Sequence, residues 1–194
     1  RVLFRSNPTG SFLICATGGT GAFNAYNWSS GFGSKLSNPV GLTAGITGNG
    51  VTFNPSGNLV AMAFDSASPY VAVYPWSGGF GTKYANPASL PNLDGYAVSF
   101  NNNGTLLAVS YFGTPYISVY PWSSGFGTKY SDPSTLPTSS QDNEFNVNGS
   151  YLASTTSSSP YLLIYPWAGG FGTKLANPSV LPEGTTISLD FRNN

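Results

Sequence analysis

Short apolar runs alternate with turn-forming residues along the whole chain, and this pattern predicts an all-β protein. In one stretch, apolar and aromatic residues cluster at 96–100, 106–110 and 116–120, with lengths typical of strands. Asn and Gly at 101–104 favour a turn through positive φ angles, and Pro121 ends the third run because proline cannot donate to a sheet ladder. No stretch of about ten residues without Gly or Pro has helical periodicity.

The same pattern recurs four times, and each recurrence carries one shared phrase. The phrase opens with tryptophan, and its constant positions are Trp, Gly, Phe, Gly, Lys and Pro. The four copies are WSSGFGSKLSNP at 28–39, WSGGFGTKYANP at 76–87, WSSGFGTKYSDP at 122–133 and WAGGFGTKLANP at 167–178. An upstream phrase, VTFNPSGNLVAMA at 51–63, recurs at 98–110 and 145–155, and the first copy, at 3–16, carries two extra residues in its turn.

These phrases divide the chain into repeats of one supersecondary unit. Four full repeats of about 45–48 residues cover about 2–47, 48–93, 94–139 and 140–184, and residues 185–194 begin a fifth. In the third repeat, a short outer strand at 128–131 would follow the three strands above. Four short antiparallel strands in a repeat of this length are typical of a β-propeller blade, and blades stack because one blade cannot bury both of its apolar faces. The sequence therefore predicts a single domain, a β-propeller or a segment of one, built of four-stranded antiparallel blades.

The start of a fifth repeat bears on how such a ring would close. A strand predicted at 187–191 is one strand more than a closed ring of four blades needs. We therefore expect one of two arrangements. Either further blades come from the same longer chain, in a propeller of about six to eight blades, or they come from a second copy that shares the ring.

The repeat resembles two known groups of propeller proteins. The phrase at 53–63 is similar to the strand–turn–strand phrase of WD40-like repeats, and Trp76 lies where their Trp-Asp pair would end the third strand. No Asp follows any of the tryptophans and the chain has no His, so this resemblance covers the plan of the blade and not the hydrogen-bonded tetrad. The tandem Tyr-Pro-Trp-x-x-Gly-Phe-Gly-Thr-Lys phrase is also similar to propeller repeats of bacteriophage structural proteins.

The second resemblance implies a function and a location. It implies a non-catalytic structural or interaction protein of the virion, such as a decoration, tail or fibre component, found on the virion or outside the cell. Its partners would be other virion or surface proteins. A carbohydrate-binding propeller lectin is the alternative, and a glycosidase or calcium-dependent hydrolase is a third interpretation.

The numbers of charged residues and cysteines limit the functions and ligands that we expect for this protein. The chain has 7 basic and 7 acidic residues, no histidine and 1 cysteine. Neutralising phosphates needs clustered Lys and Arg, so we expect no nucleic-acid partner. The longest apolar runs are far shorter than the roughly twenty residues of a membrane span. Without histidine there is no Ser-His-Asp triad, and zinc would lack its usual ligands. We therefore expect no catalytic residue, no metal and no cofactor.

A few residues unique to single repeats are candidates for binding, because features shared by all repeats are expected to specify the scaffold. Asp94, Asp142 and Glu183 fall in inter-repeat loops that a propeller would bring to one face, which is the arrangement a glycosidase or calcium site would need. Solvated loop charges are the simpler interpretation. The remaining candidates are Tyr111, Phe112 and Glu144. Cys15 is interpreted as a buried apolar filler.

The residues that recur in every repeat are interpreted as structural. The aromatic members could stack on sugars, but packing against the Gly-rich backbone is favoured; they are Trp28, Trp76, Trp122, Trp167, Phe32, Phe80, Phe126 and Phe171. The basic members would form a ring at one rim, and they are Lys35, Lys83, Lys129 and Lys174. These lysines could contact an anionic ligand, but covering apolar surface with their stems is favoured.

Overall fold

The computed structural model describes residues 4–18 and 21–191, and all regular secondary structure within them is β. The strands form four antiparallel sheets that follow one another along the sequence. The first sheet contains β1 (Phe4–Ser6), β2 (Phe12–Ala16), β3 (Phe23–Trp28) and β4 (Phe32–Lys35), and the second contains β5 (Gly48–Phe53), β6 (Leu59–Phe64) and β7 (Val71–Pro75). The third contains β8 (Gly95–Phe100), β9 (Leu106–Tyr111) and β10 (Ile117–Pro121), and the fourth contains β11 (Asp142–Phe145), β12 (Tyr151–Thr155) and β13 (Leu162–Pro166). The all-β prediction is confirmed.

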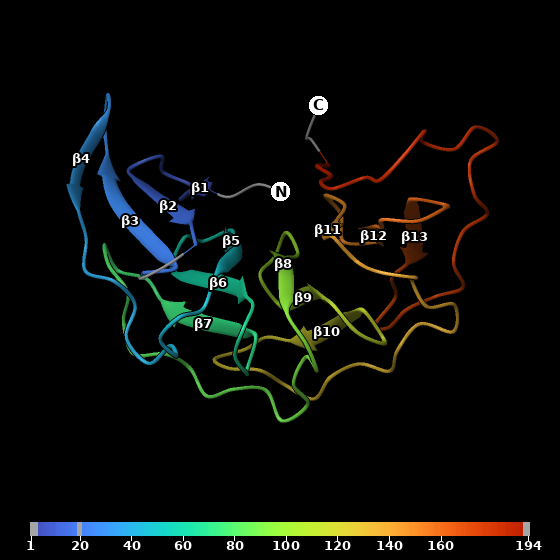
Figure 1. Cartoon of the computed structure of the whole chain (residues 1–194), viewed down its shortest axis with the longest axis horizontal. Helices are drawn as coiled ribbons and strands as arrows, with labels where there is room; N and C mark the ends of the chain where they lie inside the picture. Colours follow the sequence, from blue (N-terminus) through green and yellow to red (C-terminus); the bar gives the residue numbers. More distant parts are fainter. Residues whose placement is uncertain (1–3, 19–20, 192–194) are drawn as a thin grey trace.

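The four sheets are arranged along an open arc (Figure 1). The first strand of each sheet, namely β1, β5, β8 and β11, lies on the inner side of the arc, and neighbouring first strands contact one another. The arc is open between the sheet β1–β4 and the sheet β11–β13. The part of the chain that the structure describes contains no helix that could cross a membrane.

The prediction of four strands in every repeat is wrong for three of the sheets. Only the first sheet has a regular fourth strand, β4. In the other three, a single bridge joins the repeated Trp to the repeated Phe, as between Trp76 and Phe80, and residues 128–131 form no strand. The Trp28 N–H donates to Ser11 on the β2 side, so the N–H before it points toward β4. Proline occupies that position in the other repeats, as Pro75 does, and proline has no N–H to offer a fourth strand.

One asparagine organises the turn between the first two strands of every sheet. In the second sheet, the Asn54 N–H donates to the Leu59 carbonyl, and the Asn54 Oδ1 accepts the Leu59 N–H at 2.9 Å. Asn7, Asn101 and Asn146 make the same pair of bonds. The first copy therefore has no extra residues, contrary to the sequence prediction.

These asparagines do not supply the positive φ angle that the sequence suggested. In each turn that angle belongs to the glycine three residues further on, for example Gly57 at 70°. The asparagine instead contributes a side-chain acceptor that satisfies the first N–H of the next strand.

The apolar core lies between successive sheets. Ile14 and Phe23 of the first sheet pack with Met62 and Phe64 of the second. Residues of the second sheet such as Val73 pack with the third, and residues of the third pack with Leu152 and Trp167 of the fourth. Each inner sheet therefore buries one face against the sheet before it and the other face against the sheet after it.

The segment after the fourth sheet does not form the strand predicted at 187–191. It is held instead by side chains of β11: the Leu189 N–H donates to Asp142 at 3.1 Å, and the Phe191 N–H donates to Glu144 at 2.9 Å. The remainder of the predicted fifth copy, 192–194, lies outside the described residues. Carboxylates of the inner strand thus replace the backbone ladder along this segment.

Candidate functional site

One face of the first sheet is exposed, although the equivalent face of each of the other three sheets is buried against the preceding sheet. Leu13 pairs with Tyr26 in the same register as Val60 pairs with Tyr74, so residues of the two sheets can be matched one to one. We call the exposed surface the leading face, and it consists of Phe4, Leu13, Cys15, Tyr26, Trp28 and Phe32. Its matched residues in the second sheet are Val51, Val60, Met62, Tyr74, Trp76 and Phe80, which pack against the first sheet.

The leading face contains an apolar cavity. Its volume is about 410 Å³, and its lining consists of Phe4, Ser6, Leu13, Cys15, Trp28 and Phe32. Trp28 is 37% exposed and Phe32 is 67% exposed, whereas Trp76 is 5% exposed. Cys15 is half-buried beside this cavity, so the interpretation of this thiol as a buried filler is wrong. Contiguous exposed apolar surface of this kind marks an interaction site more often than an accident of packing.

In the other three sheets, the face equivalent to the leading face is covered by a side chain from the preceding repeat. The Trp122 ring meets the Tyr84 ring edge to face at 5.1 Å, and the Trp167 ring meets Tyr130 at the same distance. Leu36 holds the corresponding position beside the core that contains Trp76. Each of these covering residues directly follows the repeated lysine of the preceding repeat.

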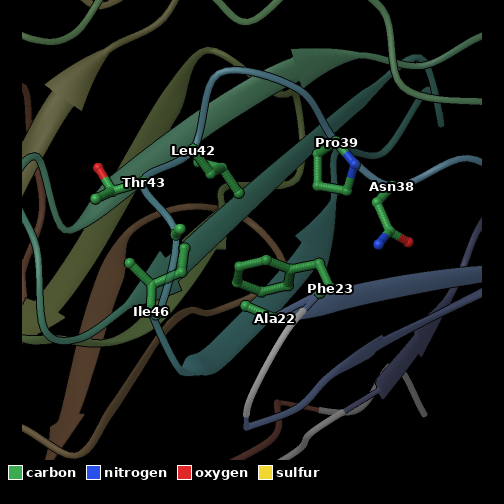
Figure 2. A pocket seen from close by; sticks show the side chains of 10 residues that line it. Ala22, Phe23, Asn38, Pro39, Leu42, Thr43 and Ile46 are labelled. Carbon is green, nitrogen blue, oxygen red and sulfur yellow. The ribbon is translucent and has the colours of Figure 1, made fainter.

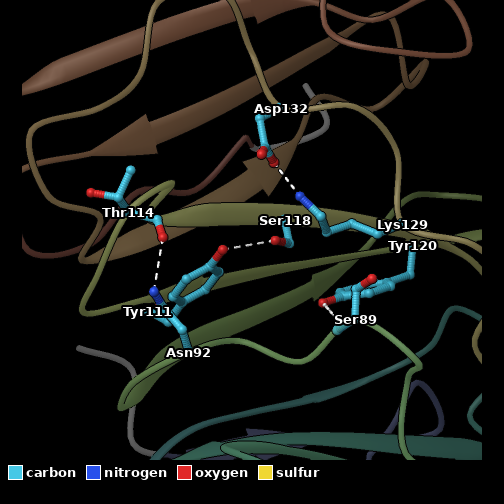
Figure 3. A network of polar contacts seen from close by, with 8 residues as sticks. All are labelled: Ser89, Asn92, Tyr111, Thr114, Ser118, Tyr120, Lys129 and Asp132. Carbon is cyan, nitrogen blue, oxygen red and sulfur yellow. Dashed lines mark hydrogen bonds and ion pairs between the residues drawn. The ribbon is translucent and has the colours of Figure 1, made fainter.

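A tyrosine hydroxyl adds one polar bond to each of these contacts. The Tyr120 hydroxyl donates to the Ser89 carbonyl at 2.6 Å (Figure 3), and Tyr165 donates to the Thr135 carbonyl at 3.0 Å. Tyr74 donates to Val40 in the same way. Each contact between sheets therefore combines apolar burial with one directed hydrogen bond to the connecting segment.

The fourth sheet presents a second uncovered surface at the other end of the arc. We call it the trailing face, and it consists of Tyr151, Leu162, Ile164 and Leu175. The matched residues of the second sheet, Leu59, Val71 and Val73, are buried in the core with the third sheet. Leu175 is 41% exposed and follows its lysine as Tyr84 and Tyr130 follow theirs.

A polar cluster lies where the first strands meet. A narrow cavity there is lined by Arg5, Asn49, Tyr96, Gln141 and Asp142, together with neighbouring residues of β5 and β8. Burial raises the pKa of Asp142 above its usual range, although hydrogen bonds from Leu189 and Asn143 oppose the shift. Burial also raises the pKa of Glu144 to about 7, with the charges of Asp190 and Asp142 adding to the effect. Both carboxyl groups hold the segment that follows the fourth sheet.

The three carboxylates suggested for a glycosidase or calcium site occupy different environments. Asp94 accepts the Ser66 N–H at 3.1 Å in the loop before β8. Asp142 is the first residue of β11 rather than a loop residue, and Glu183 is exposed. Among residues 4–18 and 21–191, no three acidic or sulfur side chains gather closely enough to hold a metal ion.

The unique aromatic pair of the third repeat is split between the core and the surface. Tyr111 is buried and shares a 2.9 Å hydrogen bond with Ser118 (Figure 3), and burial raises its pKa to about 12. Phe112 is exposed, and its ring meets the Tyr96 ring edge to face.

The repeated lysines make local contacts where the phrase ends. Lys129 forms an ion pair with Asp132 (Figure 3), and Lys174 donates to Asn177 at 2.7 Å. Lys83 donates to Asn86 in the same way, and partial burial of its ammonium group lowers its pKa. Lys35 lies at the exposed end of β4. Three of the four lysines thus fix the Asn-Pro or Asp-Pro end of their own phrase.

Two further hollows lie near connections between sheets. One is an apolar cavity of about 230 Å³ where Phe23 faces Pro39, Leu42 and Ile46 of the connecting segment (Figure 2). The other is a groove of about 400 Å³ between the turns of the third and fourth sheets. Amide side chains, including Asn103 and Asn148, line this groove beside the aromatic rings of Tyr130 and Trp167.

Sequence reasoning did not select Phe4, Leu13 or Tyr26. Leu13 and Tyr26 occupy positions that are Val or Leu and Tyr in the other repeats, whereas the position of Phe4 is Val in the second and third sheets and Asn143 in the fourth. Comparison of the chain with models of known protein families found no match, and comparison with curated protein sequences found none either.

Proposed function

We propose that this chain is a β-propeller-like structural or interaction module that works without catalysis, and that its sheets act as blades around a common axis. The observation that carries this proposal is the leading face, an apolar surface that repeats, in exposed form, the pattern buried at each contact between sheets. An exposed apolar surface of this kind is expected to be covered by another protein surface in the functional assembly.

The arrangement of the sheets supports the propeller part of the proposal. The first strands of all four sheets lie on the inner side of the arc, and each sheet packs by its faces against its neighbours. This is the arrangement expected of blades, because stacking lets each small sheet bury both apolar faces.

We further propose that the module belongs to a bacteriophage virion, as a decoration, tail or fibre component, and that its partners are other virion or surface proteins. The support for this assignment is the Tyr-Pro-Trp-x-x-Gly-Phe-Gly-Thr-Lys phrase, which begins at the end of three of the third strands, together with its resemblance to propeller repeats of bacteriophage structural proteins. An extracellular setting follows from that assignment.

Quantitative mass spectrometry of gradient-purified particles tests the proposal. We expect peptides of this chain at a ratio to the capsid protein that stays constant across the particle peak. Peptides found only in the soluble fraction of infected cells would refute the virion assignment. A soluble enzyme of the same genome, measured in the same fractions, controls for carry-over.

The amide-lined groove favours glycan binding as a second candidate function. Aromatic rings beside amide donors and acceptors suit a sugar, which offers an apolar ring face and a belt of hydroxyl groups. Glycan-array binding that is lost in Asn148→Ala and kept in Asn58→Ala would support it. The turn residue Asn58 is the matched control, because it lies at the corresponding turn of another sheet. Absence of binding on the array would remove this candidate.

A further inference from the structure

We propose that the trailing face of a second copy of this chain covers the leading face, so that two copies associate head to tail. This inference rests on the proposed function, because it names the partner of the interaction module. In such an association, each of the two uncovered faces would pack against a sheet of the other copy, as the inner sheets already pack against their neighbours.

The internal contacts are templates for this association. At three places within one chain, the face of one sheet that corresponds to the trailing face packs on the face of the next sheet that corresponds to the leading face. By strand register, each residue of the leading face has a counterpart on the face of the second sheet that the first sheet covers. Tyr151, Leu162 and Ile164 of the trailing face likewise have counterparts on the face of the second sheet that covers the third. A second copy therefore brings a surface that the fold has already fitted to this shape.

Leu175 is the residue of the trailing face that would meet the tryptophan of the second copy. Its counterparts Tyr84 and Tyr130 pack edge to face on Trp122 and Trp167 at 5.1 Å. In the first repeat, however, the counterpart is a leucine, Leu36, which packs beside the core that contains Trp76. Leucine is thus already used once in this position, and Leu175 would meet Trp28 in the same way.

The connecting segment supplies the matching polar bond. Ser89 and Thr135 accept the tyrosine hydroxyls of the third and fourth sheets through their carbonyls, and each lies two residues after the proline that ends its phrase. Val180 lies two residues after Pro178 and is exposed. Its carbonyl would accept the hydroxyl of Tyr26 from the second copy.

The inner strands at the two ends carry opposite charge at one matched position. Arg5 of β1 and Glu144 of β11 occupy equivalent places, since Arg5 pairs with Ile14 as Glu144 pairs with Ala153. Thr52 and Ser99 hold this position in the two inner sheets. Within one chain, however, the charge of Arg5 already acts on Glu144 and Asp142 and opposes the rise of their pKa values, so this pair favours neither head-to-tail nor head-to-head association of two copies.

The segment at 187–191 is held by β11, so the proposed contact excludes β11 and uses the trailing face alone. The segment lies beside β11, held through Asp142 and Glu144, whereas the trailing face lies on β12, β13 and the phrase that follows them. The two surfaces that meet are different, so the contact is heterologous, and two arcs can close on each other through two equal contacts.

Sedimentation velocity on the full chain tests the inference. We expect concentration-dependent association in the wild-type chain, weakened at least ~30-fold by Leu175→Asp, as for a central interface residue. Leu90→Asp is the matched control, because Leu90 is also 41% exposed but lies on the connection between inner sheets. A wild-type chain that stays monomeric, or equal weakening by both substitutions, would overturn the inference.

Complementation separates head-to-tail from symmetric contact. Trp28→Ala removes the leading face and Leu175→Asp the trailing face, so neither variant should associate with itself. A mixture should form a one-to-one pair, because each variant keeps the surface that the other has lost. Failure to form the pair would contradict the inference if both variants keep the wild-type circular dichroism spectrum.

The single thiol reports on the same contact without any substitution. Cys15 lies in the cavity of the leading face. Its reaction with a dithio-nitrobenzoate reagent should slow at least ~10-fold on going from the dilute to the associated chain. The Leu175→Asp variant should react at the dilute rate throughout. A rate that does not depend on concentration in associated wild-type chain would show that another surface is used.

These results are separable from those of the proposed function. A chain present in virions but monomeric would refute only the head-to-tail contact. A chain that associates but is absent from virions would refute only the virion assignment.

Discussion

The first and second sheets carry nearly the same phrase, yet their tryptophans have different surroundings. Trp28 and Trp76 both pack edge to face on the phenylalanine four residues later, at 5.1 and 5.0 Å. Trp76 also meets Phe12 of the preceding sheet, and it is buried, whereas no sheet in the described part of the chain covers Trp28, which is exposed. The local phrase therefore sets the shape of the aromatic pair, and the neighbouring sheet decides whether the pair belongs to a core.

This difference separates two kinds of stabilisation. Turns and aromatic pairs inside one sheet should contribute equally at the end of the arc and in its interior. Contacts between sheets should contribute only where a neighbour is present.

The largest effect is expected for the tryptophans. Trp76→Ala should lower the free energy of unfolding by about 3–5 kcal/mol, because it leaves a cavity among packed rings. Trp28→Ala should cost about 1 kcal/mol or less, because Trp28 is exposed and its ring packs on Phe32 of its own sheet. Urea denaturation in a Leu175→Asp background, which keeps the leading face uncovered, measures both. Equal losses would mean that the neighbouring sheet contributes nothing to Trp76.

The turn asparagines should behave alike in both sheets. Asn54→Ala and Asn7→Ala should each cost about 1–2 kcal/mol, because each removes the side-chain acceptor of the N–H that begins the next strand, namely that of Leu59 or Phe12. Their hydrogen bonds are made inside the sheet, as at 2.9 Å from the Leu59 N–H. A loss at Asn54 more than about twice the loss at Asn7 in urea denaturation would contradict a purely local role.

A smaller effect is expected for the tyrosine hydroxyls. Tyr120→Phe should cost about 1 kcal/mol, because it removes the bond to Ser89 and leaves that carbonyl without its partner. Tyr26→Phe should stay within about 0.5 kcal/mol, because the corresponding surface is not covered. Thermal unfolding of the two variants beside the wild-type chain measures the difference. A Tyr26→Phe loss as large as that of Tyr120→Phe would be incompatible with an uncovered leading face.

A further effect is expected in the dependence of stability on pH, and it concerns the fourth sheet alone. Burial raises the pKa of Glu144 from 4.5 to about 7, so the folded chain holds a proton that the unfolded chain releases. The stability that this group contributes is therefore present below pH 4.5 and declines as pH rises toward 7. Relative to Glu144→Gln, the wild-type chain should lose stability in urea denaturation between pH 5 and pH 8. Glu183→Gln is the control at an exposed carboxyl group, and it should follow the wild-type curve.

Much of the fold could be predicted, because strand patterns and turns are local properties of the sequence. The runs at 96–100, 106–110 and 116–120 coincide with β8, β9 and β10 to within a residue or so at either end. The missing fourth strands were not predicted, although proline before the tryptophan was a visible signal. The role of Asn54 was also missed, because a side-chain acceptor and a positive φ angle leave the same asparagine-glycine pattern in the sequence.

The leading face could not be predicted from the phrase alone. Trp28 and Trp76 look equivalent in sequence, and the exposure of Trp28 depends on a neighbour that no local pattern reports. Asp142 was placed in a loop because a polar run seldom forms an inner strand. Here it does so because partners satisfy its polar groups, as Asn143 donates to Ser110 and accepts from Ser99 at 2.7 Å.

Because each sheet is supported only by its neighbours, the arc has a built-in order of opening. The sheets β1–β4 and β11–β13 are each supported on one side, so local fluctuations should fray them first, while β6 and β9 keep their backbone amides protected longest from hydrogen exchange. A chain closed by a second copy has no such ends. Its backbone amides would then exchange hydrogen as one cooperative unit. Assembly would therefore replace local unfolding from the two end sheets by a single global unfolding transition.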